Sequence, residues 1–74
     1  MFSKMRKDAK AALKEKKMTY GQLSAVTGLS ESTIKRFMCG ADDSRRVAEK
    51  IADTLNQRLV YGQGVYSLES EGNT

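Results

Sequence analysis

Residues 19–40 read TYGQLSAVTGLSESTIKRFMCG, an amphipathic helical pattern that a glycine interrupts near its middle. Thr19 and Gln22 have the spacing of a capping box, which predicts a helix over residues 20–27. Gly28 then supplies the left-handed backbone conformation that ends a helix without a Cβ clash. The interruption therefore marks the end of one helix and the beginning of a turn.

A second helix begins three residues after this glycine. Ser30 is a favoured N-cap residue and predicts a helix over residues 31–38, which Gly40 ends in the same way. Two helices joined by a short glycine turn are typical of a helix-turn-helix. In that motif the first helix lies over the DNA backbone, and the second offers its N-terminal residues to the major groove.

Three further elements are predicted on either side of the motif. One helix covers residues 3–17 with Ser3 as its N-cap, and another covers residues 45–55. Residues 58–68, RLVYGQGVYSL, place β-forming residues on both sides of Gly-Gln-Gly, which predicts a hairpin. The alternatives are a frayed tail and a segment that pairs two protomers. Residues 69–74 are polar and are predicted to form a disordered tail.

Length and composition allow one domain with a small core. The chain has 74 residues, of which 39% are hydrophobic, and this leaves little room for a buried catalytic pocket. The candidate core consists of apolar side chains at helical spacing, namely Met5, Ala9, Ala12, Leu13, Met18, Leu23, Val26, Leu29, Ile34, Phe37, Met38, Val47, Ala48, Ile51, Ala52 and Leu55.

Enzymes and metalloproteins are excluded by the residues that the chain lacks. It has no histidine, no pair of cysteines, no phosphate-binding glycine loop and no nucleophile with a neighbouring base. We therefore expect no enzymatic activity, no metal and no cofactor. The single Cys39 fits a reducing compartment, and no apolar leader or membrane span is present, which together predict a cytoplasmic protein.

The positive charge is concentrated in the first half of the chain. Residues 1–36 contain nine Lys or Arg and three Asp or Glu, a net charge of +6, whereas residues 37–74 have a net charge of −2. A basic half suits a polyanion, either nucleic acid or an anionic membrane surface. The alternative is a solvated, lysine-rich helix face without a partner.

The residues MTYGQLSAVTGLSESTIKRFMCG resemble the Cro/repressor-type helix-turn-helix, or XRE family, of phage repressors and bacterial regulators. The resemblance extends over about residues 4–56, where KIADTL matches the closing helix of the family. It implies an all-α fold, a compact four- to five-helix bundle of the lambda-repressor-like type, with a DNA-binding domain over 1–57. It also implies a homodimer on a palindromic operator in the cytoplasm of a bacterial cell or phage-infected host.

Three features depart from the family pattern. Ser24 stands where alanine is usual, which should be tolerated because both side chains are small. The loop after Gly40 is normally basic, whereas here it reads Ala-Asp-Asp. The tail has the hairpin-like segment in place of an apolar fifth helix.

The resemblance also implies which residues contact DNA. Base-reading positions fall at the exposed start of the second motif helix, at Glu31, Ser32, Lys35 and Arg36. Arginine can donate two hydrogen bonds to guanine, glutamate can accept one from cytosine, and serine can bond either way. Thr33 lies on the same helix but can instead bond its own backbone. Phosphate contacts are expected at Lys17, Thr19 and Tyr20.

These observations predict a sequence-specific transcriptional regulator that reads double-stranded DNA with residues 31–38. A second interpretation is an antirepressor or modulator that uses the same scaffold to bind another repressor protein. Glu31 and the Asp42-Asp43 loop favour it, because acids repel phosphates and attract a basic recognition surface. A third interpretation places residues 3–17 on a membrane surface, but this helix lacks the apolar face that such binding needs.

Overall fold

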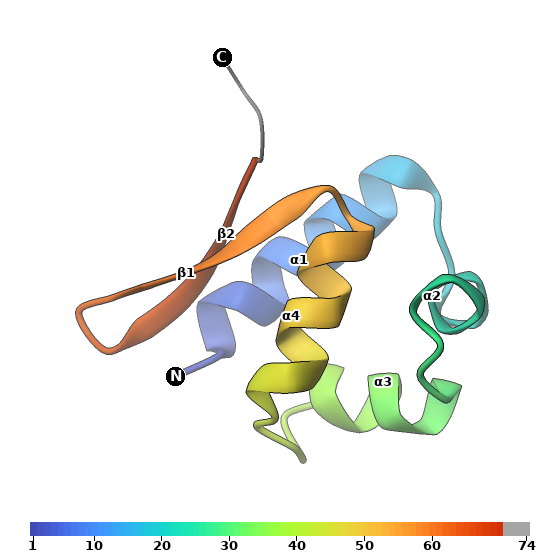
Figure 1. Ribbon diagram of the computed structural model, residues 1–74, viewed down its shortest axis with the longest axis horizontal. Helices are drawn as coiled ribbons and strands as arrows, with labels where there is room; N and C mark the ends of the chain where they lie inside the picture. The colour runs from blue at the N-terminus through green and yellow to red at the C-terminus, as the bar shows by residue number, and fades with distance from the viewer. Residues whose placement is uncertain (71–74) are drawn as a thin grey trace.

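The computed structural model describes residues 1–70 and consists of four helices followed by a hairpin (Figure 1). The elements are α1 (Ser3–Lys16), α2 (Tyr20–Thr27), α3 (Glu31–Met38), α4 (Arg45–Thr54), β1 (Gln57–Gly62) and β2 (Val65–Ser70). The expected four-helix arrangement is confirmed, and the all-α class is corrected only at the end of the chain, where two antiparallel strands follow α4. The predicted helices and the predicted hairpin are confirmed.

The hairpin closes through a two-residue turn. Gln63 and Gly64 have φ of 56° and 78°, and two positive φ values in succession are characteristic of the type I′ turn that suits a twisted hairpin. The strands pair from Gly62–Val65 at the turn to Gln57–Ser70 at the far end. The hairpin is thus longer than the predicted 58–68, and β2 includes Glu69 and Ser70 of the predicted tail. The rest of that tail, residues 71–74, lies outside the described residues.

The hairpin packs against the helices of its own chain. Leu59, Tyr66 and Leu68 are partly buried against the core. On the outer edge of β2, the Tyr66 N–H donates to the carbonyl of Met1 at 2.9 Å, and the Leu68 N–H donates to Asp8 Oδ2 at 3.1 Å. The start of α1 therefore covers one edge of the hairpin, and the hairpin covers the end of the core.

The core is formed where the apolar faces of the four helices meet. Most of the predicted core residues are buried, and Met18 and Leu29 pack against the core while partly exposed. The prediction that Val26 is buried is wrong, because its side chain is 65% exposed. Successive residues of an α-helix are rotated by about 100° around its axis. Viewed down the axis, Val26 therefore lies on one side of the buried Leu23, and Tyr20 and Thr27 lie on the other. Those two residues are partly buried and mark the inner side of α2.

Phe2 is a core residue that the sequence pattern did not reveal. Its side chain is 2% exposed, stacks on Tyr66 with ring centroids 4.5 Å apart, and meets Phe37 edge-on at 5.5 Å. Phe2 also occupies the N-cap position of α1, and no side chain caps this helix, so the predicted cap at Ser3 is wrong. Aromatic packing takes the place of a capping hydrogen bond at this end.

Candidate nucleic-acid interface

The N-terminus of α2 is built by a capping box. Thr19 Oγ1 accepts from the Gln22 N–H at 3.1 Å, and Gln22 Oε1 accepts from the Thr19 N–H at 2.9 Å. The N–H groups of Tyr20 and Gly21 also belong to this first turn, which has no intrahelical acceptors for them. A helix end of this kind favours an anion, because its N–H groups and its dipole both attract negative charge.

The turn between α2 and α3 is held by side-chain hydrogen bonds as well as by glycine. Gly28 has φ of +80° and its N–H donates to the Ser24 carbonyl at 3.0 Å. The Ser24 hydroxyl donates to the Leu29 carbonyl at 2.5 Å. Thr27 Oγ1 accepts from the Leu29 N–H at 3.1 Å and donates to the Leu23 carbonyl at 2.8 Å. Ser24 is therefore a structural part of the turn, which an alanine would not be.

The start of α3 has a hydroxyl pair as its cap. Ser30 Oγ accepts from the Thr33 N–H at 3.1 Å and lies 2.8 Å from Thr33 Oγ1. The Thr33 hydroxyl is thus engaged with the Ser30 side chain, and not with its own backbone as the sequence alternative proposed. The predicted base-reading side chains Ser32, Lys35 and Arg36 are all exposed. They point outward because the opposite side of the short helix is buried in the core.

Glu31 links the first turns of α2 and α3. Its Oε2 lies 3.5 Å from Lys35 Nζ, one turn further along α3. Its Oε1 would lie 3.8 Å from a Cβ added to Gly21, and Thr19 Oγ1 would lie 3.7 Å from the same atom. The Glu31 carboxylate therefore lies beside the N-terminus of α2, where the helix dipole favours negative charge.

The predicted phosphate contacts lie together at the junction of α1 and α2. Lys17 ends α1 in the left-handed conformation with φ of 55°, and its side chain is exposed. Thr19 follows as the N-cap of α2. Tyr20 is partly buried and packs against the core, so only part of its surface faces solvent. The position of Gly21 between Thr19 and the Glu31 carboxylate places this junction next to the start of α3.

Arg6 is a key residue of the site's framework that sequence reasoning missed. Its Nε donates to the Phe37 carbonyl at 2.6 Å, and its Nη2 donates to the Asp42 carbonyl at 2.8 Å and to Asp43 Oδ1 at 2.7 Å. The guanidinium also lies 4.8 Å from the Phe37 ring centroid. It therefore ties the end of α3 and the following loop to α1. The only signal in the sequence was an arginine next to core residue Met5, among lysines.

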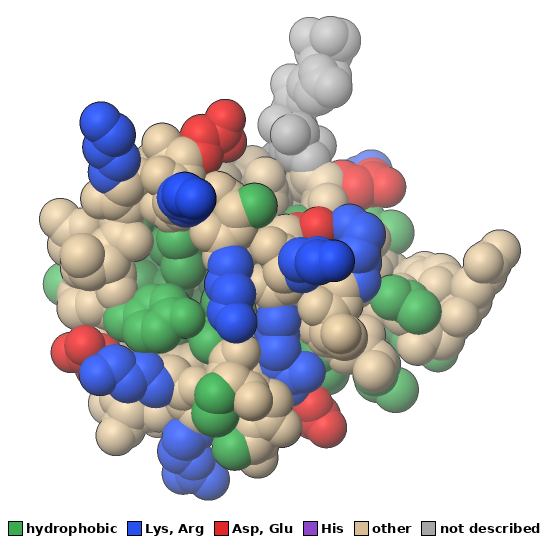
Figure 2. All heavy atoms as spheres, turned by 180° about the vertical axis from the view of Figure 1, so that it is seen from behind, with side chains coloured by type: hydrophobic (Ala, Val, Ile, Leu, Met, Phe, Trp, Pro, Cys, Tyr) green, Lys and Arg blue, Asp and Glu red, His purple; other side chains and the backbone are tan. Residues whose placement is uncertain are grey.

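Basic side chains gather on the face opposite to the view of Figure 1. Figure 2 shows Lys and Arg side chains down the middle of this face, with few acidic side chains between them. Within residues 1–70, no group of His, Cys, Asp or Glu side chains could hold a metal ion. None of the helices in the same range has both the length and the apolar character that crossing a bilayer requires.

Residues 10–59 match the model of the Cro/C1-type helix-turn-helix DNA-binding domain family. The chain belongs to this family. Searches of curated proteins and of solved structures found no significant match. The family match begins within α1 and includes α2, α3 and α4. As a Cro/C1-type protein, the chain carries a DNA-binding domain of the helix-turn-helix class. Its predicted phage or bacterial origin, cytoplasmic location and lack of enzymatic activity stay predictions.

The Cro/C1-type match does not include the two ends of the chain that pack on each other. Phe2 and Arg6 precede the matched residues, and Tyr66 follows them. The contacts that these residues make are therefore features of this chain rather than of the matched pattern.

Proposed function

We propose that this Cro/C1-type protein is a sequence-specific transcriptional regulator that reads the major groove of double-stranded DNA with α3. The observation that carries the proposal is the outward row of Ser32, Lys35 and Arg36 on a helix whose opposite side is locked in the core. Arg36 has the donor geometry for guanine O6 and N7, and Ser32 can serve as donor or acceptor. Lys35 can donate to guanine as well.

Phosphate contacts at the start of α2 would set the register of α3 in the groove. Lys17 and the first-turn N–H groups beside Thr19 supply positive charge and donors at this end. The Glu31 carboxylate lies beside the same donors. Its pairing with Lys35 reduces the repulsion that a nearby phosphate would meet, and it can accept from cytosine N4 in the groove.

The internal contacts of the acidic residues favour DNA over a second repressor as the partner. Asp43 pairs with Arg6 at 2.7 Å, and Glu31 pairs with Lys35 at 3.5 Å. Two of the three acids that suggested a protein partner thus have basic partners within the chain, and Arg6 also binds the backbone carbonyl of the third, Asp42. The antirepressor interpretation becomes the alternative outcome of the experiment below.

We also propose that two copies pair through the free edge of β1 and bind a palindrome. In an antiparallel hairpin, alternate residues direct their N–H and C=O groups away from the partner strand. The N–H groups of Tyr66 and Leu68 point to the covered edge of β2. The backbone N–H and C=O groups of their partners on β1, Tyr61 and Leu59, therefore point outward from the other edge of the hairpin. Among residues 1–70 no hydrogen bond reaches this edge of β1. Twofold pairing there would give two recognition helices for two half-sites.

Selection of bound fragments from random duplex DNA tests the proposal. Enrichment of a palindromic sequence is the expected result. If no sequence is enriched, and a purified basic repressor is retained by the protein in a pull-down, the antirepressor function would replace it. The full chain should be used, because Tyr66 and Leu68 at its end pack against the core.

A further inference from the structure

The exposed side of α1 carries a row of lysines that have no part in the proposed contacts of α3 with DNA bases. Lys7, Lys10 and Lys14 are spaced by three and four residues, which places them on one side of the helix. All three side chains are exposed, and none forms an ion pair or hydrogen bond within residues 1–70. Lys17 at the end of α1 continues the row.

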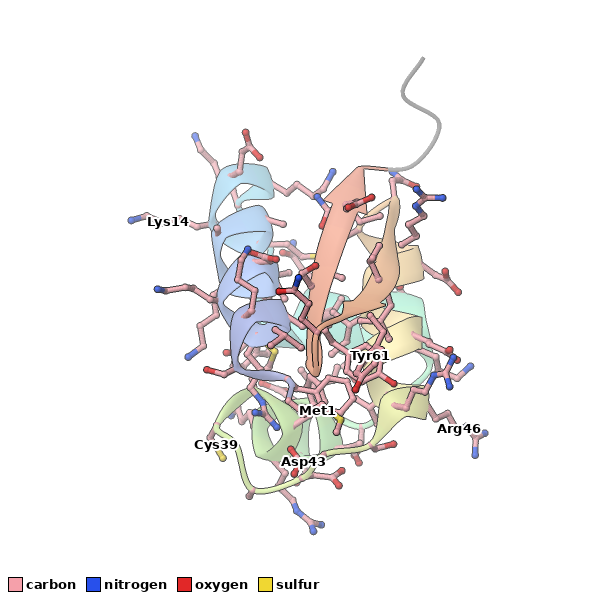
Figure 3. All side chains as sticks on the ribbon, turned by 90° about the vertical axis from the view of Figure 1, so that its left-hand side faces the viewer. Met1, Lys14, Cys39, Asp43, Arg46 and Tyr61 are labelled. Atoms are coloured by element: carbon pink, nitrogen blue, oxygen red, sulfur yellow. The ribbon has the colours of Figure 1, made fainter. Side chains whose placement is uncertain are left out.

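The acidic residues of α1 lie toward the hairpin and away from this row. Asp8 accepts from the Leu68 N–H and from Lys4 Nζ, at 3.1 and 2.6 Å. Glu15 borders a groove that Asp8 and Leu68 also line. Lys14 borders the same groove, but Figure 3 shows its side chain pointing away from the hairpin. The lysine row is therefore a surface of a single sign, and it faces solvent.

Each end of the row adjoins the helix-turn-helix. Lys7 and Lys10 line a shallow groove together with Cys39 and Gly40, which directly follow α3. At the other end, Lys17 is two residues from Thr19, the N-cap of α2. Figures 1 and 3 place α1 on the side of the molecule that Figure 2 displays, where the basic side chains gather. The row thus runs from the end of α3 to the start of α2.

We propose that Lys7, Lys10 and Lys14 form a second track for DNA phosphates, on the strand that borders the groove on the α1 side. This inference rests on the proposed function. From Lys7 to Lys14 the helix rises about 10 Å, which is long enough for the row to reach more than one phosphate of a strand. Lysine ammonium groups on flexible stems bind phosphates as point charges without reading sequence. The track supplies affinity for any duplex, and α3 supplies the choice of sequence.

Two matched double variants test the track by the salt dependence of DNA binding. Lys10→Gln with Lys14→Gln removes two charges from the row, and Arg46→Gln with Lys50→Gln removes two charges from α4. Both pairs have i,i+4 spacing, and Figure 3 shows Arg46 on the opposite side of the molecule from Lys14. Glutamine has a helix propensity close to that of lysine and arginine, so both variants should fold, which thermal melting checks.

The measured quantity is the slope of log K against log salt on a mixed-sequence duplex and on a selected duplex. We expect the slope of the Lys10/Lys14 variant to become shallower by about 2 on both duplexes, since each phosphate contact contributes about 0.9. The Arg46/Lys50 variant should keep the slope of the natural chain. An unchanged slope in the first variant, or an equal change in both, would overturn the track.

The same measurements separate this inference from the proposed function. If the natural chain binds DNA but the Lys10/Lys14 variant keeps its slope, only the phosphate track is wrong. An acidic protein would then be the partner to test for the lysine row. If the slope falls as expected but no sequence is ever enriched, the track stands and the sequence-specific function fails. If the natural chain binds no duplex even at low salt, both are wrong.

Discussion

Lys17 adopts a backbone conformation that an ordinary side chain disfavours. Its φ of 55° ends α1 in the left-handed region, where a residue with a Cβ is strained by about 1–2 kcal/mol. Many helices place glycine at this position. The presence of a lysine is consistent with a role for its charge, next to the start of α2.

Replacing Lys17 with glycine should separate folding from binding. We expect Lys17→Gly to raise the free energy of unfolding by about 0.5–1 kcal/mol. Glycine removes the backbone strain, and its larger loss of conformational entropy on folding offsets part of that gain. The same variant should bind all duplexes more weakly, with a salt slope shallower by about 1. Urea unfolding and DNA titration measure the two effects. Unchanged affinity in a stabilised variant would contradict the phosphate contact.

Gly28 is required for its backbone and not for lack of space. Its φ is +80°, and apart from residues 27–29 themselves no atom of residues 1–70 lies within 4 Å of an added Cβ. We expect Gly28→Val to lower the free energy of unfolding by about 2 kcal/mol, because a β-branched residue resists positive φ. Gly28→Asn should lose much less, since asparagine visits this region more readily. Equal losses in thermal or urea unfolding would rule out backbone strain as the cause.

Arg36 is the strongest candidate for reading a base. Arg36→Ala should weaken binding to a selected duplex by about 1–3 kcal/mol and relax the preference at one base position. Binding is measured on the selected duplex and on its single-base variants. Arg46→Ala, which removes an exposed arginine from α4, is the control and should leave the preference intact. An equal loss on every duplex would assign Arg36 to the phosphates instead.

Contacts between elements hold α3 in position. Arg6 on α1 binds the last turn of α3 and the loop after it, and Phe2 packs between Phe37 of α3 and Tyr66 of β2. The start of α1 is thereby the point where α3 and the hairpin are joined. Changes at this junction should reach the proposed base-reading side chains of α3.

The packing of Phe2 predicts a graded loss of stability. Phe2→Ala should cost about 3–5 kcal/mol, because it leaves a cavity among aromatic rings. That loss is comparable to the whole free energy of unfolding expected for a domain of this size, so Phe2→Ala can fail to fold. Phe2→Leu has an expected cost of about 1 kcal/mol and should stay folded, which allows its stability to be measured. Urea unfolding followed by circular dichroism records both. If neither variant differs from the natural chain, the buried position of Phe2 is contradicted.

Within residues 1–70, the arrangement of the whole molecule leaves the outer edge of β1 uncovered. Tyr61, near the hairpin turn, is the large hydrophobic residue exposed on β1, whereas the exposed Val65 and Met1 lie on the β2 side. Exposed apolar residues beside an unpaired strand edge are what an edge-to-edge dimer would cover.

A charge on this edge should dissociate the proposed dimer. We expect Tyr61→Lys to shift the monomer–dimer equilibrium toward monomer, because two like charges would meet at the paired edges. Gln63→Lys adds the same charge in the hairpin turn and is the control. Sedimentation equilibrium over a range of concentrations measures the association. A natural chain that remains monomeric at every concentration would contradict the dimer.

Local chemistry was sufficient to predict the helices and the motif. The capping box of Thr19 and Gln22, the cap at Ser30 and the positive φ of Gly28 each depend on residues within about one helical turn. Such signals are visible in a linear sequence because their partners are neighbours in it. The hairpin was predicted for the same reason, since its turn and flanking β-forming residues are contiguous.

Only the tertiary structure could assign the roles of residues whose partners are distant in the chain. Arg6 contacts residues 31 to 37 positions away, and Asp8 bonds a strand 60 positions away. Phe2 is buried because Phe37 of α3 and Tyr66 of β2 pack against it, and Val26 is exposed because no element within residues 1–70 covers its side of α2. Burial depends on which surfaces meet in space, and helical periodicity predicts a face without saying what packs against it.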